Sequence, residues 1–403
     1  MATCPTSLFS QMLDLVPRGL FHRLVVEHGV ERHSKGFSSW DQTVAMLFCQ
    51  LAGAKSLREI GHGLGACMGK LNHLGLPKTP ARSTLSYANT HRDWQLFRDL
   101  ALKLRGELFW QSREQGGSHH GFRFHNKLFS LDSSTIDLCL SLFPWAEFRQ
   151  TKGAVKLHTL LDHDGYFPSF VMISDGKLGD ITAARLLGEK QLPKGSIVAM
   201  DRGYNDYKLF AAWSARGVYF VTRMKDNTIY EVISERPVSD HARAKGIRRD
   251  CLIRLTSAQG QRDCPVTLRL VLYHDAKENR ELSFLTNHLN LSPVTIAGIY
   301  RERWQIELFF KLLKQHFKIK TFVGTSENAL KTQIWTALLA VMLLKYLHWQ
   351  SRCPLSLSNL VAVLHWHLFS YRDLWAWLKE PGGPVPEPPG EQLLLPHLDS
   401  IRR

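Results

Sequence analysis

Four polar side chains recur at helical spacing late in the chain, where a helical stretch is predicted from Ser292 to about Phe317. Their offsets are 0, 3, 7 and 14, and they are Tyr300, Arg303, Glu307 and Lys314. At about 100° per residue they fall within an arc of roughly 60°, while apolar residues cover the opposite side. The stretch therefore presents one acid among cations on a single face, although a solvated amphipathic helix gives a similar pattern.

Two further acids follow predicted buried strands in the middle of the chain. Asp132 ends the apolar run 127–131, and Asp201 ends the run 196–200. Because α/β sheets place their ligands at the carboxyl ends of strands, both positions suit a site. A single Asp at a strand end is more often a turn or cap residue, so each position has a structural interpretation when taken alone. The combination of the three acids favours function.

Three blocks that contain these acids resemble the signature blocks of a known family. They are Leu-Asp-Ser-Ser-Thr at 131–135, Met-Asp-Arg-Gly-Tyr at 200–204 and the segment 300–314. All three are similar to blocks of bacterial insertion-sequence transposases of family four, which belong to the DDE class. The third block matches that family's Tyr-x(2)-Arg-x(3)-Glu-x(6)-Lys signature at every position. The resemblance covers roughly residues 120–350, including the similar downstream segment 321–335.

The resemblance implies a DNA transposase that binds the ends of its insertion sequence and catalyses strand cleavage and strand transfer. It implies that Asp132, Asp201 and Glu307 are catalytic and bind two divalent metal ions. The expected ion is Mg²⁺, with Mn²⁺ as a substitute, since oxygen ligands suit hard ions. Water is the first nucleophile in such a reaction, and the freed 3′-hydroxyl then attacks DNA.

The same resemblance assigns DNA contacts and partners. It implies that Tyr300, Arg303 and Lys314 hold phosphates near the cleaved end, whereas Trp304 is expected to pack. The expected partner is double-stranded DNA, both transposon ends and target, bound by a homodimer in a synaptic complex. Some family members stack a Trp on a flipped base, but no Trp lies between residues 226 and 286 here. Tyr230 or Tyr273 could take that place.

The elements that must position these residues indicate an α/β fold. From Phe122 the pattern runs strand, hairpin, helix, strand, helix, strand, which is the order of a ribonuclease-H-like core. We assign this DDE catalytic domain to residues 120–350. Within it, Asp180 is predicted to cap a helix through Leu187, and residues 162–165 form the hairpin turn. A mainly β insertion at about 226–286 is predicted to hold strands at 228–233, 251–256, 266–273 and 282–285.

Helical periodicity predicts an all-α N-terminal domain over residues 1–115 that precedes the catalytic core. Two of its segments, 56–64 and 79–89, could form a DNA-binding helix-turn-helix. In that interpretation Arg82, Ser83 and Ser86 face a DNA groove, while a packed helical bundle explains the segments equally well.

The remaining segments are a linker, a buried helix and a tail. Residues 111–120 are predicted to be a linker, and 328–349 an apolar helix buried against the sheet. Residues 351–403 hold a C-terminal helix and a Pro-rich tail from Pro381 to Pro396, which is expected to be extended or disordered.

Composition limits the partners and the compartment. The chain has 403 residues, 44% of them hydrophobic, and a net charge of +15 from 51 Lys and Arg against 36 Asp and Glu. A strongly basic protein attracts polyanions, and the longest apolar run is far shorter than the roughly 20 residues that span a bilayer. We therefore expect nucleic acid and no membrane as partner. Seven scattered cysteines without a Cys-x-x-Cys pair favour a reducing cytoplasm. With DNA as partner, the expected location is cytoplasmic and nucleoid-associated.

Several other polar groups have weaker functional interpretations. One group has residue types that could ligate a metal, but a hairpin turn explains it better. It consists of His158, Asp162, His163 and Asp164. Lys156 and Lys177 could line the DNA path. A basic run in the insertion could follow a DNA backbone or be a solvated loop, namely Arg243, Lys245, Arg248 and Arg249.

Two alternatives to a transposase remain open at this point. A ribonuclease-H-like nuclease without strand transfer would keep the same acids. An inactive, domesticated DNA-binding protein would not need them, and the intact Asp132, Asp201 and Glu307 argue against it.

Overall fold

The computed structural model describes residues 6–32, 34, 36–66, 71–113, 121–149 and 152–383. The chain divides into two compact units. Unit 1 contains Met1–Leu104, His316–Gly324 and Asn328–Arg403, and unit 2 contains Arg105–Gln315 and Thr325–Glu327. Cys4, Cys67 and most of the Pro-rich tail lie outside the described residues, and the other five cysteines are free thiols.

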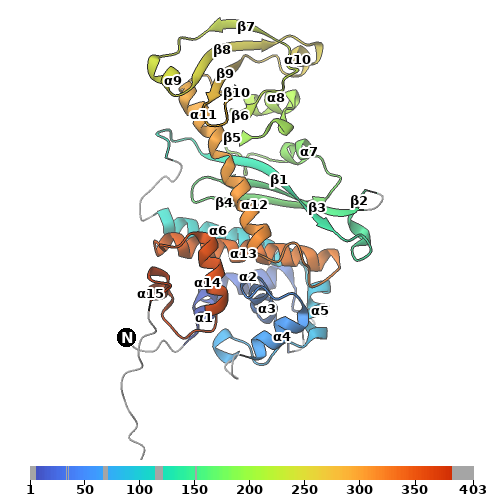
Figure 1. Cartoon of the computed structure of the whole chain (residues 1–403). Coiled ribbons are helices and arrows are strands. Elements are labelled where there is room, and N and C mark those ends of the chain that lie inside the picture. Colours follow the sequence, from blue (N-terminus) through green and yellow to red (C-terminus); the bar gives the residue numbers. More distant parts are fainter. Residues whose placement is uncertain are drawn as a thin grey trace, which may run out of the picture. The chain divides into compact units, whose positions relative to one another are not determined.

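Unit 2 is built around one mixed sheet, which confirms the α/β class (Figure 1). In the described residues it has ten strands in the order β2-β3-β1-β5-β6-β10-β9-β8-β7, with β4 paired to β3. The pairs β1–β5 and β5–β6 are parallel, and the others are antiparallel. The strands are β1 (Leu128–Leu138), β2 (Glu147–Arg149), β3 (Lys152–Asp162), β4 (Phe167–Asp175), β5 (Ile197–Met200), β6 (Tyr219–Arg223), β7 (Tyr230–Glu235), β8 (Ile247–Leu255), β9 (Leu268–Asp275) and β10 (Arg280–Thr286).

The strands expected within the insertion are confirmed, and they continue the central sheet. Strand β10 pairs with β6 from Phe284↔Arg223 to Thr286↔Val221, and β9, β8 and β7 follow outward. The hairpin of β3 and β4 is confirmed as well. Its turn places Gly165 at φ 83°, a left-handed conformation that glycine adopts without a steric cost.

The prediction that Asp132 ends a strand is wrong. Strand β1 continues through Asp132 to Leu138, because β3 pairs with it antiparallel as far as Leu138↔Gly153. Its parallel pairing with β5, however, stops at Leu131↔Met200, directly before Asp132 and Asp201. The two aspartates therefore follow the last paired residues of neighbouring strands.

Both faces of the sheet are covered within unit 2. Val198 and Met200 of β5 belong to a core cluster with helix α8 (Tyr207–Ala215), whereas Ile197 and Ala199 belong to a cluster with α11 (Pro293–Glu302). Side chains alternate between faces along a strand, so this division shows a sheet buried on both sides. The other helices of unit 2 are α7 (Asp180–Arg185), α9 (Asp240–Ala244), α10 (Ala258–Asp263), α12 (Trp304–His316), η2 (Pro144–Ala146) and η3 (Arg202–Tyr204).

Two predicted helix boundaries need correction. Asp180 is the first residue of α7, and the N-cap is Gly179, so the Asp180 side chain does not cap the helix. The stretch from Ser292 to Phe317 is two helices, α11 and α12, interrupted at Arg303 (Figure 1). At the interruption, bonds from Arg303 N–H to Tyr300 O and from Ile306 N–H to Arg303 O span three residues, which tightens the backbone locally.

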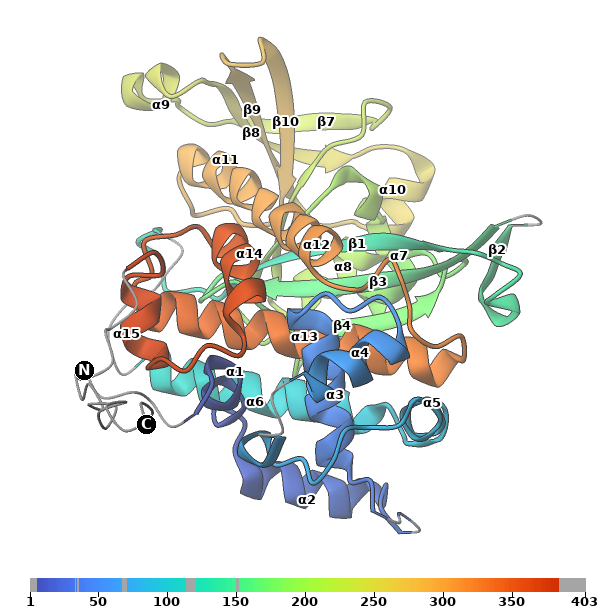
Figure 2. The ribbon, with the colours of Figure 1, turned by 60° about the horizontal axis from the view of Figure 1, so that its bottom comes forward.

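Unit 1 is helical in its described residues. Figure 2 shows these helices, with α13 running through the middle of the group. They are α1 (Leu8–Leu13), α2 (Arg18–His28), α3 (Ser39–Leu51), α4 (Leu57–Gly65), η1 (Leu71–Leu74), α5 (Arg82–His91), most of α6 (Gln95–Arg113), α13 (Glu327–Gln350), α14 (Leu357–His367) and α15 (Leu374–Lys379). Since α6 continues to Arg113, the predicted linker cannot begin at 111, and residues 114–120 lie outside the described part of the chain.

Helix α13 is the core helix of unit 1. It is long and apolar enough to cross a membrane, but 89% of its most apolar window is buried inside the structure. Gln50 donates to the Gln333 carbonyl over 3.1 Å, and Asn328 donates to the carbonyls of Asn89 and Arg92. These bonds join α13 to the N-terminal helices, so a separate all-α N-terminal domain is not confirmed. We expected this helix to be buried against the sheet, but it belongs to unit 1, whereas the sheet belongs to unit 2.

Candidate active site

Asp132 lies on β1 with a side chain that is mostly buried. The Ser133 N–H donates to Asp132 Oδ1 over 2.8 Å, which fixes one carboxylate oxygen. Burial, together with the negative charges of Asp201 and Glu307, raises the pKa of the Asp132 carboxyl to about 6. Asp201 and Glu307 are therefore both close enough to act on the Asp132 carboxyl.

Asp201 follows β5 directly, as predicted, and is held in a tight turn. Its Oδ1 accepts the Gly203 N–H over 2.8 Å, and its carbonyl accepts the Thr222 hydroxyl of β6 over 2.9 Å. A Cβ atom at Gly203 would lie only 3.0 Å from Asp201 Oδ1. The glycine of the Asp-Arg-Gly-Tyr block thus makes room for the carboxylate.

Arg303 joins two of the predicted acids. Its Nη1 lies 3.5 Å from Asp132 Oδ2, and its Nη2 donates to Glu307 Oε1 over 2.5 Å. Burial alone would lower the pKa of the Arg303 guanidinium, but the bond to Glu307 and the nearby charges raise it overall. The cation is therefore permanent and neutralises part of the acidic site.

Tyr300 and Lys314 flank the same site. The Tyr300 ring lies 5.6 Å from the Arg303 guanidinium carbon and packs on Phe284 at 4.8 Å. Lys314 Nζ donates to the Thr135 carbonyl of β1 over 2.8 Å. Trp304 is 55% exposed, so the expectation that it packs is wrong.

The donor set suits a hard divalent cation. Carboxylate oxygens from β1, the end of β5 and α12 are the ligands that such ions prefer. Within the described residues no group of three His, Cys, Asp or Glu converges as metal ligands, and the Arg303 guanidinium binds both Asp132 and Glu307. The arrangement has the charge for a metal site, with an arginine as its present counterion.

A polar network next to the site escaped the sequence analysis. Ser133 Oγ donates to Asp180 Oδ1 over 2.7 Å, and Lys156 Nζ donates to the same oxygen over 3.2 Å. Tyr204 is buried nearby. The sequence offered one signal for this network, since Ser133 and Tyr204 lie inside the first and second blocks.

The weaker candidates have structural partners. Asp162 is buried and pairs with Arg105 at 2.9 Å and Lys127 at 3.2 Å, and His163 bonds to Ser130 at 2.7 Å. These contacts fix the β3–β4 turn, as the hairpin interpretation required. Lys177 Nζ lies 3.9 Å from a Glu147 carboxylate oxygen.

The candidate residues of the insertion differ in exposure. Tyr230 and Tyr273 are half-buried and pack against the two core clusters. In the basic run, Arg249 pairs with Glu235, whereas Arg243, Lys245 and Arg248 are exposed.

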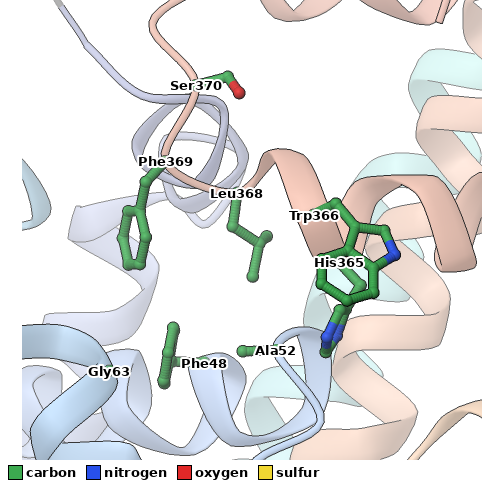
Figure 3. Close-up of a pocket in the computed structure, with 8 residues that line it drawn as sticks. All are labelled: Phe48, Ala52, Gly63, His365, Trp366, Leu368, Phe369 and Ser370. Atoms are coloured by element: carbon green, nitrogen blue, oxygen red, sulfur yellow. The ribbon is translucent and has the colours of Figure 1, made fainter. Parts of the chain in front are cut away.

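Unit 1 holds a separate pocket and the predicted helix-turn-helix. The pocket, of about 390 Å³, is mainly apolar and contains none of the predicted site residues. Figure 3 shows its lining, which is Phe48, Ala52, Gly63, His365, Trp366, Leu368, Phe369 and Ser370. The segments 56–64 and 79–89 correspond to α4 and α5, and Arg82, Ser83 and Ser86 are exposed.

Comparison with known proteins identifies the class. The chain belongs to the family described as transposase DDE domain, whose model matches residues 124–343. A second family model, described as a domain of unknown function (DUF4372), matches residues 5–77.

Curated relatives agree with the family. The chain is 29% identical over 307 residues to transposase y4zB of Sinorhizobium fredii, covering 76% of this chain and 82% of the relative. It is 28% identical to the transposase for insertion sequence element IS5377 of Geobacillus stearothermophilus, with coverages of 60% and 62%. Transposase InsG for insertion sequence element IS4 of Escherichia coli is 26% identical, with coverages of 39% and 36%.

Among solved structures, the piggyBac transposase synaptic complex with hairpin DNA covers 94% of this chain and 81% of that chain. The identity is 9% and the TM-score 0.41. The family and the curated relatives show a DDE-type DNA transposase, an enzyme that acts on DNA, and favour neither a simple nuclease nor a domesticated binding protein. Enzymes of this family are generally dependent on divalent metal ions.

Proposed function

We propose that Asp132, Asp201 and Glu307 are the catalytic carboxylates of this transposase and hold two divalent ions, Mg²⁺ with Mn²⁺ as a substitute. The observation that carries the proposal is the shared acidic site, in which the charges of Asp201 and Glu307 both raise the pKa of Asp132. When bound, such ions activate the attacking oxygen and stabilise the leaving oxygen of a phosphoryl transfer. The chain's own role is to hold three oxygen ligands in place from separate elements.

The proposed reaction is cleavage at the end of the insertion sequence followed by strand transfer. Water attacks the phosphodiester first, and the 3′-hydroxyl that is released then attacks target DNA. The spaced signature in residues 300–314 supports assignment to insertion-sequence family four. The order β1, hairpin β3–β4, α7, β5, α8 and β6 supports a ribonuclease-H-like core. We propose that residues 120–350 supply this catalytic domain, preceded by a helical region over 1–115.

Tyr300, Arg303 and Lys314 are the proposed DNA contacts. Arg303 has a geometry that supports a second partner, because its buried Nε atom has no hydrogen-bond partner in the described residues. A phosphate oxygen could accept from the exposed part of the guanidinium, whose side chain is 13% accessible. Lys314 donates to the carbonyl of Thr135, three residues after Asp132 on β1. Its ammonium group therefore lies near enough to the site to contact the same DNA backbone.

Two copies acting on two DNA ends form the proposed synaptic complex, and a cytoplasmic, nucleoid-associated location follows from DNA as partner. The decisive test is incubation of the purified protein with its own element ends and Mg²⁺. We expect nicked ends and joined products that are lost when chelator is added. Cleavage that never yields joined products would instead indicate a nuclease.

A further inference from the structure

Asp180 is a further acid next to the proposed catalytic residues, and the proposed function gives it no role. It begins α7, but its side chain turns away from the helix amides and accepts from Ser133 Oγ at 2.7 Å and Lys156 Nζ at 3.2 Å. His158 Nδ1 lies 3.5 Å from the same Asp180 oxygen. Burial lowers the pKa of His158 to about 4, so Lys156 supplies the positive charge at neutral pH.

Strand register places this network on one face of β1. Ser133 pairs with His158 and Thr135 with Lys156 across β1 and β3, so these four side chains share a face. Leu131, two residues before Ser133, belongs to the cluster that contains α8 residues. Asp132 alternates with them, and its side chain therefore points to the opposite face.

Ser133 links the two faces. Its backbone N–H donates to Asp132 Oδ1 at 2.8 Å, and its hydroxyl donates to Asp180 Oδ1 at 2.7 Å. Any rotation of the Ser133 peptide would break the first bond and disturb the second. Asp180 and Lys156 consequently fix the donor that orients the Asp132 carboxylate.

Tyr204 is a second, independent observation at the same place. Its side chain is 2% exposed, and its buried hydroxyl lies close to the Ser133 side chain. Burial raises the pKa of Tyr204, and the charges of Asp132, Asp180 and Asp201 raise it further. The hydroxyl therefore keeps its proton and stays available as a donor beside Ser133.

We propose that Asp180, acting through Ser133, is a positioning residue for Asp132, and that the Tyr204 hydroxyl belongs to the same supporting network. The inference rests on the proposed role of Asp132 as a metal ligand. Replacing a residue that orients a metal-binding carboxylate weakens metal binding, even though that residue does not contact the ion. Asp180 contacts the face of β1 opposite to the Asp132 side chain and would not be a ligand.

The experiment titrates the DNA-free full-length protein with Mn²⁺ by electron paramagnetic resonance and records thermal unfolding without metal. Ser133→Ala and Asp180→Asn should each weaken Mn²⁺ binding by about tenfold, with Tyr204→Phe showing a smaller loss in the same direction. Ser133→Thr keeps the hydroxyl and should bind as wild type. Asp240→Asn, which removes an exposed charge on α9, is the matched control and should change nothing.

Two outcomes would overturn the inference. Wild-type Mn²⁺ affinity in Ser133→Ala would show that the hydroxyl bond does not orient Asp132. Loss of all binding in Asp180→Asn, equal to that in Asp132→Ala, would make Asp180 a ligand. Ser133→Ala leaves the Asp180–Lys156 pair intact, so the test holds even if Asp180→Asn folds poorly. If Asp132→Ala itself binds Mn²⁺ normally, the proposed catalytic site fails rather than the network alone.

Discussion

Two acid–arginine pairs in unit 2 differ in burial and in geometry. Asp250 and Arg269, on β8 and β9, have side chains 3% and 0% exposed and form two bonds of 2.8 and 2.7 Å. Arg269 also donates to the Leu291 carbonyl at 2.6 Å, close to the start of α11. Asp132 and Arg303 approach only to 3.5 Å, with side chains 21% and 13% exposed.

The difference separates a structural ion pair from the candidate active site. A buried pair is tolerated when geometry satisfies both partners, as for Asp250 and Arg269. At the candidate site Arg303 leaves Nε without a partner among the described residues, and Asp132 has a raised pKa beside two more acids. Strained charge balance of this kind is typical of functional sites, because a ligand is needed to complete it.

The largest effect expected is the loss of chemistry without loss of fold. Single replacement of Asp132, Asp201 or Glu307 by Ala should reduce cleavage of element ends about a thousandfold or more, since several kcal/mol of transition-state stabilisation are lost. End binding in a gel-shift assay should survive. Near-normal cleavage in Mg²⁺ by any one variant would remove that residue from the proposed triad.

The opposite profile is expected at the structural pair. Asp250→Ala leaves the Arg269 guanidinium buried without its carboxylate, which should cost about 3–5 kcal/mol of unfolding free energy. Urea unfolding of this variant beside Asp240→Ala, an exposed control, measures the loss. An unchanged midpoint would show that the two pairs do not differ in this way.

The raised pKa of Asp132 makes both the stability and the proposed metal binding depend on pH. Its pKa is raised from 3.8 to about 6, so without metal the folded protein holds a proton that the unfolded chain releases at lower pH. Stability from the neutral carboxyl is therefore lost as pH rises between about 4 and 6, by an amount of the order of 2 kcal/mol. Metal needs the ionised form, so Mn²⁺ affinity should fall as pH drops below about 6.

The stability trend should disappear in Asp132→Asn, whose amide does not titrate, and this variant should bind Mn²⁺ only weakly at every pH. The measurements are metal-free thermal unfolding from about pH 4 to 7.5 and Mn²⁺ titration from about pH 5 to 7.5. A flat Mn²⁺ affinity over that range would contradict the assignment of Asp132 as a ligand with a raised pKa.

The smallest effect expected concerns DNA affinity. Lys314→Ala should reduce the slope of log affinity against log salt by about 0.9, the contribution of one phosphate contact to duplex DNA. Lys311→Ala, an exposed lysine on the same helix, is the control for lost charge. A wild-type slope in Lys314→Ala would leave its bond to the Thr135 carbonyl as a purely structural contact.

Local pattern was sufficient to predict much of the framework. Strand β5, helix α8, the β3–β4 hairpin and the strands of the insertion follow from apolar runs and turn residues that act over a few positions. The spacing of Tyr300, Arg303, Glu307 and Lys314 is likewise a property of the chain alone. The charge of +15 indicates a polyanionic partner through composition alone, because long-range attraction depends on net charge more than on fold.

Tertiary structure decided which of these residues meet. Strand β1 runs past Asp132 because β3 pairs with it along its length, and no local signal carries the length of a partner strand. Asp180 lies where the sequence predicts a helix cap, yet its carboxylate accepts from Ser133 and Lys156 instead. These residues are 47 and 24 positions away in the sequence. Helix α13 joins unit 1 because Asn89, Arg92 and Gln50 bond to it across more than 200 residues of chain. Such contacts depend on which surfaces the completed fold brings together, and periodicity within one segment does not contain that information.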